Sequence, residues 1–144
     1  MTFRKNKEYF DQHWTADKVK DEVEKGLALL NNIDHKIVTV FGSARPTAED
    51  KEYQHCENLA HSLGQKGYAI ISGGGPGIMH AANSGAMRAR APSIGMRATL
   101  LTTERVNDSI FTHDLQFHFI CTKILNVDKK RSAHFLSWGL WNAQ

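Results

Sequence analysis

The residues best suited to chemistry gather in the segment ISGGGPGIMHAA, residues 71–82, where four of five consecutive positions are glycine. Gly73, Gly74, Gly75 and Gly77 follow a short apolar run and precede a stretch with helical character. Without Cβ atoms they let backbone N–H groups approach an anion, and a helix N-terminus adds partial positive charge. A tight turn that binds nothing is the alternative, but four clustered glycines favour a phosphate ligand.

A second loop, Gly42-Ser43-Ala44-Arg45, closes the β-branched run that begins at residue 36. If both apolar runs are parallel strands, the two loops lie at the same carboxyl edge of the sheet, where ligands bind. Arg45 is a candidate for contacting a phosphate there, and a solvated loop arginine is the alternative.

A dinucleotide-binding domain is the first hypothesis for such a loop, and two features oppose it. The dinucleotide glycine fingerprint belongs after the first strand, whereas here the glycine-rich loop follows the second. That fingerprint also needs an acidic residue about 20 positions further on to hold the ribose. Residues 58–103 contain no Asp or Glu, but they carry Lys66, Arg88, Arg90 and Arg97. A mononucleotide therefore fits the sequence better.

Apolar patterns predict the elements that position these loops. Val19, Val23, Leu27 and Leu30 form a helical stripe, with Thr15 as its cap and Asn31-Asn32 as its end. Strands are predicted at residues 36–43, 68–72 and 93–96. The helix between the first two opens at Thr47, in a capping box with Asp50, and ends at Lys66-Gly67.

Two further helices are expected later in the chain. Pro76 suits the first position of a helix after the glycine loop, and residues 114–125 are interpreted as another helix. Alternating strands and helices at this spacing predict an α/β fold with a Rossmann-like open parallel sheet and flanking helices.

Composition limits the possible classes of protein. The 144 residues suffice for one compact domain, and the net charge of +3 is too diffuse to indicate nucleic-acid binding. No signal peptide or membrane-spanning run is evident, so we expect a cytoplasmic protein. Cys56 and Cys121 do not make a disulfide framework. The pair His113-Asp114 with His118 lacks zinc-site spacing, so no metal is expected.

Three motifs, VFGSARP, ISGGGPGIMHAANSGA and FTHDLQFHF, occur in an order and spacing that resemble the LONELY GUY family. This family is often labelled lysine-decarboxylase-like, and the closer likeness is to its longer bacterial branch. The resemblance covers residues 36–125. It implies a Rossmann-like fold, a homodimer, and hydrolysis of the N-glycosidic bond of AMP or a cytokinin ribotide. The products are free base and ribose 5-phosphate, and no metal or redox cofactor is needed.

The resemblance also assigns site residues. Gly42 and Ser43 correspond to the first nucleotide-contacting loop of the family. The second loop corresponds to Ser72, Gly73, Gly74, Gly75, Gly77, Ile78 and Met79. His80 stands where relatives usually have glutamate. Lys123 aligns with a family arginine implicated in catalysis; lysine keeps the charge but loses the bidentate fork.

The family's PGGxGTxxE motif, which binds phosphate and supplies a catalytic carboxylate, does not occur in this sequence. Codons chosen for residues 134–144 spell IFFPGGFGTL when shifted by one base, close to the missing motif. We therefore hypothesise a frameshift near Leu125, with a short paralogue as the alternative. The expected organisation is a helical segment at 1–34, a nucleotide-binding domain at 35–125 and a non-family tail at 126–144.

Two consequences follow from this hypothesis. The sheet should be incomplete at its C-terminus, leaving an unpaired edge and less apolar cover over Val38, Val40 and Ile70. The chain then belongs to a phosphoribohydrolase lineage but does not turn over substrate, and its homodimer is in doubt. A non-catalytic nucleotide-binding module of the same fold is the alternative, and an inert remnant is the third possibility.

Overall fold

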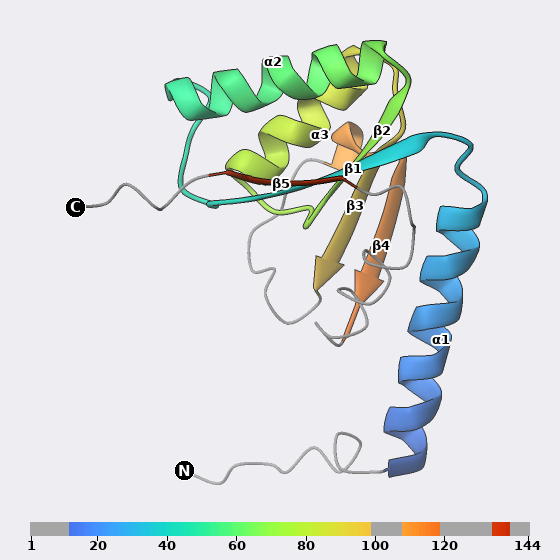
Figure 1. Ribbon diagram of the computed structural model, residues 1–144. Helices are drawn as coiled ribbons and strands as arrows, with labels where there is room; N and C mark the ends of the chain where they lie inside the picture. Colours follow the sequence, from blue (N-terminus) through green and yellow to red (C-terminus); the bar gives the residue numbers. More distant parts are fainter. Residues whose placement is uncertain (1–11, 99–107, 119–133, 139–144) are drawn as a thin grey trace, which may run out of the picture.

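The computed structural model describes residues 12–98, 108–118 and 134–138 (Figure 1). The elements alternate along the chain as predicted for an α/β protein. In chain order they are α1 (Gln12–Asn31), β1 (Lys36–Gly42), α2 (Lys51–Gln65), β2 (Tyr68–Ser72), α3 (Ile78–Arg88), β3 (Ser93–Ala98), the 3₁₀ turn η2 (Asp108–Ile110), β4 (His113–Phe117) and β5 (His134–Trp138). None of the described helices is long and apolar enough to cross a membrane.

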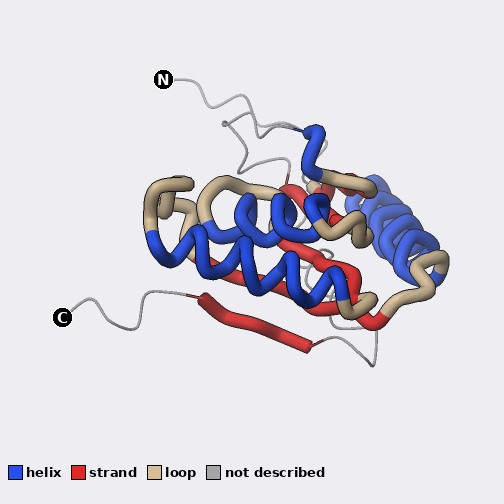
Figure 2. Tube along the Cα trace, turned by 90° about the horizontal axis from the view of Figure 1, so that it is seen from above, coloured by secondary structure: helices blue, strands red, loops and turns tan. Residues whose placement is uncertain are grey.

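All five strands form one parallel sheet in the order β4-β3-β2-β1-β5. The predicted α/β class, with an open Rossmann-like parallel sheet and flanking helices, is confirmed. Helices α2 and α3 lie side by side over one face of the sheet (Figures 1 and 2). Helix α1 lies on the other side (Figure 1).

Alternation along β1 and β2 divides the hydrophobic core into two layers. Val38, Val40 and Ile70 face α2 and α3, whereas Ile37 and Ile71 face the layer that holds Leu30 at the end of α1. Successive side chains of a strand point to opposite faces, so a strand covered on both faces is apolar throughout. This explains why the first two strands could be located from continuous apolar runs.

The sheet was expected to have an unpaired edge, but β5 pairs with β1. Strand β5 runs parallel to β1, with Val38 opposite His134 and Gly42 opposite Trp138. Val38 and Ile70 are also fully covered, at 3% and 0% exposure, because α2 and α3 pack on them. The expectations of an open edge and thin cover were therefore wrong, because a segment of the predicted tail pairs with the sheet.

Residues 113–117 form strand β4 and not the predicted helix. Leu115 and Phe117 point into the core layer on the α1 side. Asp114 and Gln116 take the alternate positions and are exposed. This two-residue period is that of a strand, and the pairing of β4 with β3 settles the choice. Residues 119–125 lie outside the described residues.

The helix ends differ from prediction by a few residues. Helix α1 includes Thr15, which is therefore not its cap. Helix α2 opens after Asp50, whose carboxylate accepts the backbone N–H of Thr47 at 2.7 Å. Gly77, and not Pro76, immediately precedes α3. The order and type of these helices are unaffected.

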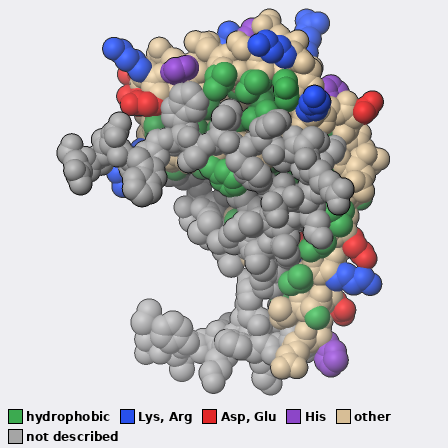
Figure 3. Space-filling view, in the orientation of Figure 1, with side chains coloured by type: hydrophobic (Ala, Val, Ile, Leu, Met, Phe, Trp, Pro, Cys, Tyr) green, Lys and Arg blue, Asp and Glu red, His purple; other side chains and the backbone are tan. Residues whose placement is uncertain are grey.

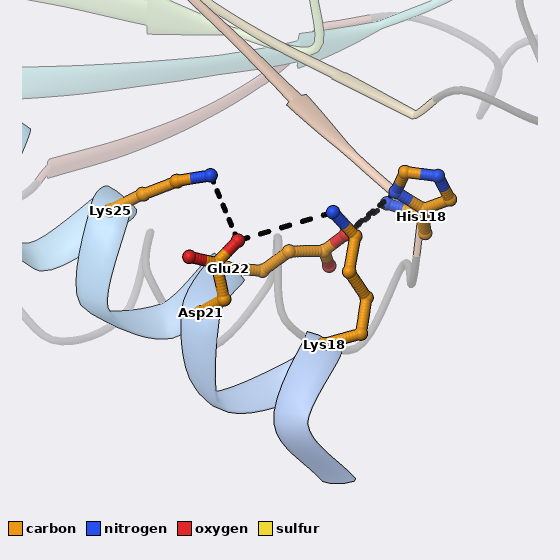
Figure 4. A network of polar contacts seen from close by, with 5 residues as sticks. All are labelled: Lys18, Asp21, Glu22, Lys25 and His118. Atoms are coloured by element: carbon orange, nitrogen blue, oxygen red, sulfur yellow. Dashed lines mark hydrogen bonds and ion pairs between the residues drawn. The ribbon is translucent and has the colours of Figure 1, made fainter. Parts of the chain in front are cut away.

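A buried carboxylate fastens α1 to the end of β4. Glu22 is 3% exposed, and its Oε1 accepts the backbone N–H of His118 at 2.6 Å and lies 3.0 Å from His118 Nδ1 (Figure 4). A buried charge must be paired or hydrogen-bonded, which this arrangement achieves. The neighbouring Asp21 pairs instead with Lys25 at 2.8 Å on the exposed side, where acidic and basic side chains line α1 (Figure 3).

We predict that Glu22→Ala lowers the free energy of unfolding by about 1–3 kcal/mol, because the His118 N–H loses its acceptor. Asp21→Ala, one residue away, should change it much less, because exposed ion pairs contribute little. Urea unfolding of both variants measures the difference. Equal effects would show that the Glu22 contact does not hold α1.

Candidate functional site

The two predicted loops meet at the carboxyl edge of the sheet. The backbone N–H of Ile78 donates to the Ser43 carbonyl at 2.9 Å. Gly77 has φ +71°, and a Cβ there would lie 2.3 Å from the same carbonyl oxygen. Only glycine accepts both this left-handed backbone and this close approach. Gly77 therefore lets the loop after β1 pack directly on the start of α3.

Gly74 permits a second close approach, to strand β3. Its φ is +70°, and a Cβ there would lie 2.4 Å from Cγ of Arg97. Its backbone N–H donates to Ser72 Oγ at 3.0 Å. The glycine loop thus rests on the aliphatic part of Arg97 while its conformation is held from within by Ser72.

Two buried residues of the glycine loop have backbone donors without a partner among the described residues. The N–H groups of Gly75 and Gly77 donate no hydrogen bond there, although both residues are buried. A buried backbone N–H normally has a partner in a folded protein. Helix α3 begins directly after Gly77 and carries no acidic residue in its first turn. This end of α3 therefore offers two N–H donors and the positive end of a helix dipole to an anion.

A chain of buried hydrogen bonds anchors the loop to the sheet. Ser72 Oγ, which accepts the Gly74 N–H, donates in turn to Oδ1 of Asn83 on α3. The Asn83 amide nitrogen donates to Ser93 Oγ at 2.9 Å and to the Ile94 carbonyl at 3.3 Å. Asn83 is 0% exposed and uses both its amide oxygen and its amide nitrogen. It therefore ties together β2, α3 and β3.

The series of buried hydrogen bonds continues from β3 towards β4. Ser93 Oγ lies 2.6 Å from the Ile110 carbonyl, to which it donates. The Ser93 N–H donates to Thr112 Oγ1 at 2.8 Å, and that hydroxyl donates back to the Ser93 carbonyl at 3.0 Å. The glycine loop is thereby coupled to the segment that leads into β4.

Arg97 and Asp114 form a bidentate ion pair beside the glycine loop. Arg97 Nε donates to Asp114 Oδ1 at 2.9 Å, and its NH2 group donates to Oδ2. The guanidinium lies 5.5 Å from the centre of the Phe111 ring, in cation–π contact. The sequence placed Asp114 in the FTHDLQFHF motif and predicted no metal there; it did not predict this ion pair, because no spacing rule links β4 to the glycine loop.

The predicted site residues differ in their accessibility. Ser72, Gly74, Gly75, Gly77 and Ile78 are buried, whereas Gly42, Ser43, Gly73 and Met79 are half-buried. The Ile78 N–H is engaged by Ser43, and its side chain is in the core, so Ile78 contributes to the loop contact. Arg45 is exposed, and its backbone N–H donates to Ser43 Oγ at 3.2 Å. Lys123 lies outside the described residues.

Tyr53 and His80 meet between the first turns of α2 and α3. The Tyr53 hydroxyl lies 2.5 Å from His80 Nδ1. Burial lowers the pKa of His80, opposed by the carboxylate of Glu57, and burial also raises the pKa of Tyr53. The neutral imidazole can therefore accept the Tyr53 proton at Nδ1. His80 thus bridges the helices at the position where the resemblance leads one to expect glutamate.

Other titratable groups do not form a second centre in the described part of the chain. No group of three His, Cys, Asp or Glu side chains could hold a metal ion there. His113 lies 2.9 Å from the Thr112 hydroxyl, whereas His118 pairs with Glu22. Burial raises the pKa of Cys56 to about 11, which keeps its thiol protonated and unreactive.

The comparisons with known proteins fit this geometry. The model of the SLOG cluster4 family matches residues 35–129, more than half of the chain. The chain belongs to this SLOG family. The match includes both loops and the Asn83 network, which supports the resemblance at the level of SLOG and LOG-like proteins. A search of curated proteins finds no match.

Solved structures show the same architecture. The X-ray structure of TM1055, a target of the Northeast Structural Genomics Consortium, is similar with a TM-score of 0.56 and 24% sequence identity. The similarity covers 72% of this chain and 61% of TM1055, so this chain spans less than two thirds of that one. At this identity the likeness establishes the fold alone.

We predict that Asn83→Asp destabilises the SLOG fold by about 3 kcal/mol or more, because a buried acceptor would face Ser93 Oγ and the Ile94 carbonyl. Ser84→Ala, the next residue of α3, should cost about 1 kcal/mol or less, because its partly buried hydroxyl loses only a bond to Glu57. Chemical unfolding compares the two. Similar losses of stability in the two variants would show that the donor role of the Asn83 amide nitrogen does not matter.

We predict a pH-dependent stability term from His80. Its folded-state pKa lies below the ordinary 6.5, so the folded protein binds fewer protons there than the unfolded chain. The resulting contribution to the stability of the folded protein is complete above pH 6.5 and is lost as the pH falls through the lowered pKa of His80. His80→Gln should remove this part of the slope, whereas His35→Gln, at an exposed residue, should retain it. Thermal unfolding against pH measures the slopes, and parallel profiles for all three proteins would contradict the assignment.

Proposed function

We propose that this protein binds a nucleoside 5′-monophosphate, with its phosphate at the start of α3. The observation that carries the proposal is that the N–H groups of the buried residues Gly75 and Gly77 have no partner in the part of the chain that the structure describes. The helix dipole adds to their attraction for a phosphate. Exposed Arg45 stands on the adjoining loop and supplies a cation at the rim.

The corresponding reaction class is hydrolysis of the N-glycosidic bond, to free base and ribose 5-phosphate. This rests on the resemblance to LONELY GUY phosphoribohydrolases and on membership of the SLOG cluster4 family. The reaction develops positive charge on the ribose, which a carboxylate must stabilise while water is activated. The 144 residues contain no PGGxGTxxE motif, and Lys123 stands where the resemblance predicts arginine. We therefore propose that this chain holds the nucleotide without cleaving it.

Cleavage remains the competing function, because both functions share the same phosphate site. A homodimer would not supply the PGGxGTxxE carboxylate, because both copies have this same sequence. Incubating the purified chain with AMP separates the two functions. Saturable binding without adenine supports the proposed binding function, whereas released adenine supports hydrolysis. If neither AMP binding nor adenine release is detected, the proposal of a nucleotide ligand is wrong.

We predict that Gly77→Ala weakens AMP binding by about tenfold or more, because its Cβ would strike the Ser43 carbonyl and displace the N–H donors. Gly67→Ala is the matched control. Gly67 also has a positive φ, +88°, but nothing lies within 4 Å of its added Cβ. It should lose some stability and keep its AMP affinity. Calorimetric titration measures both, and an unchanged affinity in Gly77→Ala would place the phosphate elsewhere.

A further inference from the structure

The Arg97–Asp114 pair adjoins the candidate phosphate site without belonging to the glycine loop. Arg97 joins the two, because its Cγ lies under Gly74 and its guanidinium binds Asp114. Arg97 and Asp114 come from neighbouring parallel strands, with Gly95 opposite Asp114. The Asp114 carboxylate is therefore separated from the glycine loop by the length of one arginine side chain.

The Asp114 carboxylate keeps acceptor capacity after binding Arg97. Each oxygen accepts one hydrogen bond from the guanidinium, and a carboxylate oxygen can accept more than one. The Asp114 side chain is 30% exposed, whereas that of Arg97 is 13% exposed. The accessible group is thus the Asp114 carboxylate, an oriented acceptor that suits hydroxyl donors.

Arg97 also makes a carboxylate compatible with a phosphate nearby. An isolated carboxylate beside the glycine loop would repel an anionic ligand. The guanidinium neutralises Asp114 and is itself held by the Phe111 ring, so the pair has a fixed direction and no net charge. A ligand with an anionic end and a diol end fits this arrangement.

We propose that Asp114, oriented by Arg97, is the group that recognises the ribose 2′- and 3′-hydroxyls of the bound nucleotide. This proposal rests on the proposed nucleotide binding and specifies its sugar subsite. Asp114 would be the acidic ribose acceptor that residues 58–103 lack. It lies on β4, further along the sequence than the position about 20 residues after the loop where a dinucleotide fingerprint has its acidic residue. Asp114 is here a specificity-determining residue and takes no part in bond cleavage.

The test compares AMP with 2′,3′-dideoxy-AMP by calorimetric titration, with methyl phosphate as a probe of the phosphate site alone. The wild-type chain should bind AMP about tenfold or more tightly than the dideoxy analogue, because hydrogen bonds to a charged acceptor are strong. Asp114→Asn should bring this ratio close to one and leave methyl phosphate binding within about twofold. Gln116→Ala, the next exposed residue on the same side of β4, should keep the wild-type ratio.

The possible outcomes separate the two proposals. Equal wild-type affinity for AMP and its analogue overturns the ribose subsite while nucleotide binding stands. A wild-type ratio that survives in Asp114→Asn also overturns it, because another group must then contact the sugar. Binding of none of the three probes overturns nucleotide binding itself and the subsite with it. If Asp114→Asn does not fold, Asp114→Glu, which keeps the charge but moves the carboxylate, should also lower the ratio.

Discussion

The buried side chain of Asn83 is the interaction on which the site depends most. It accepts from Ser72 and donates to Ser93 and Ile94, so one amide links β2, α3 and β3. Each group in this series of hydrogen bonds has a defined role as donor or acceptor. A buried network of this kind is stabilising only when every member is satisfied, and then it specifies one arrangement. This network reaches the glycine loop through Ser72, whose hydroxyl donates to Asn83 and accepts the Gly74 N–H.

The glycines of the loop have separate roles. Gly77 admits the carbonyl of Ser43, and Gly74 admits the side chain of Arg97. The Ile78 N–H donates to the Ser43 carbonyl and the Gly74 N–H to Ser72 Oγ, so fewer donors remain for a ligand than the glycine count suggests. The donors of Gly75 and Gly77 are then the ones that define where a phosphate would be held. The loop is therefore a structural junction as well as a candidate binding site.

Charge is distributed unevenly around this junction. The first turn of α3 lacks an acidic residue, and His80 within it is kept neutral by burial beside Tyr53. The nearby carboxylate, Asp114, is neutralised by Arg97. The positive end of the α3 dipole is thus not cancelled by its described neighbours, which suits an anionic ligand in the SLOG fold.

The sequence by itself determined the first three strands, the helices between them and the glycine loop. Their signals are local: continuous apolar runs, helical spacing and glycines at a strand end. It did not predict β4, because the alternation of Leu115 and Phe117 is too short to distinguish from a helix without its partner strand. It also failed to place β5 at the edge of β1, since the choice of a neighbouring strand carries no local signal. The juxtaposition of Asp114 with Gly74 was decided by tertiary structure alone, because it depends on β3 lying between two segments that are distant in sequence.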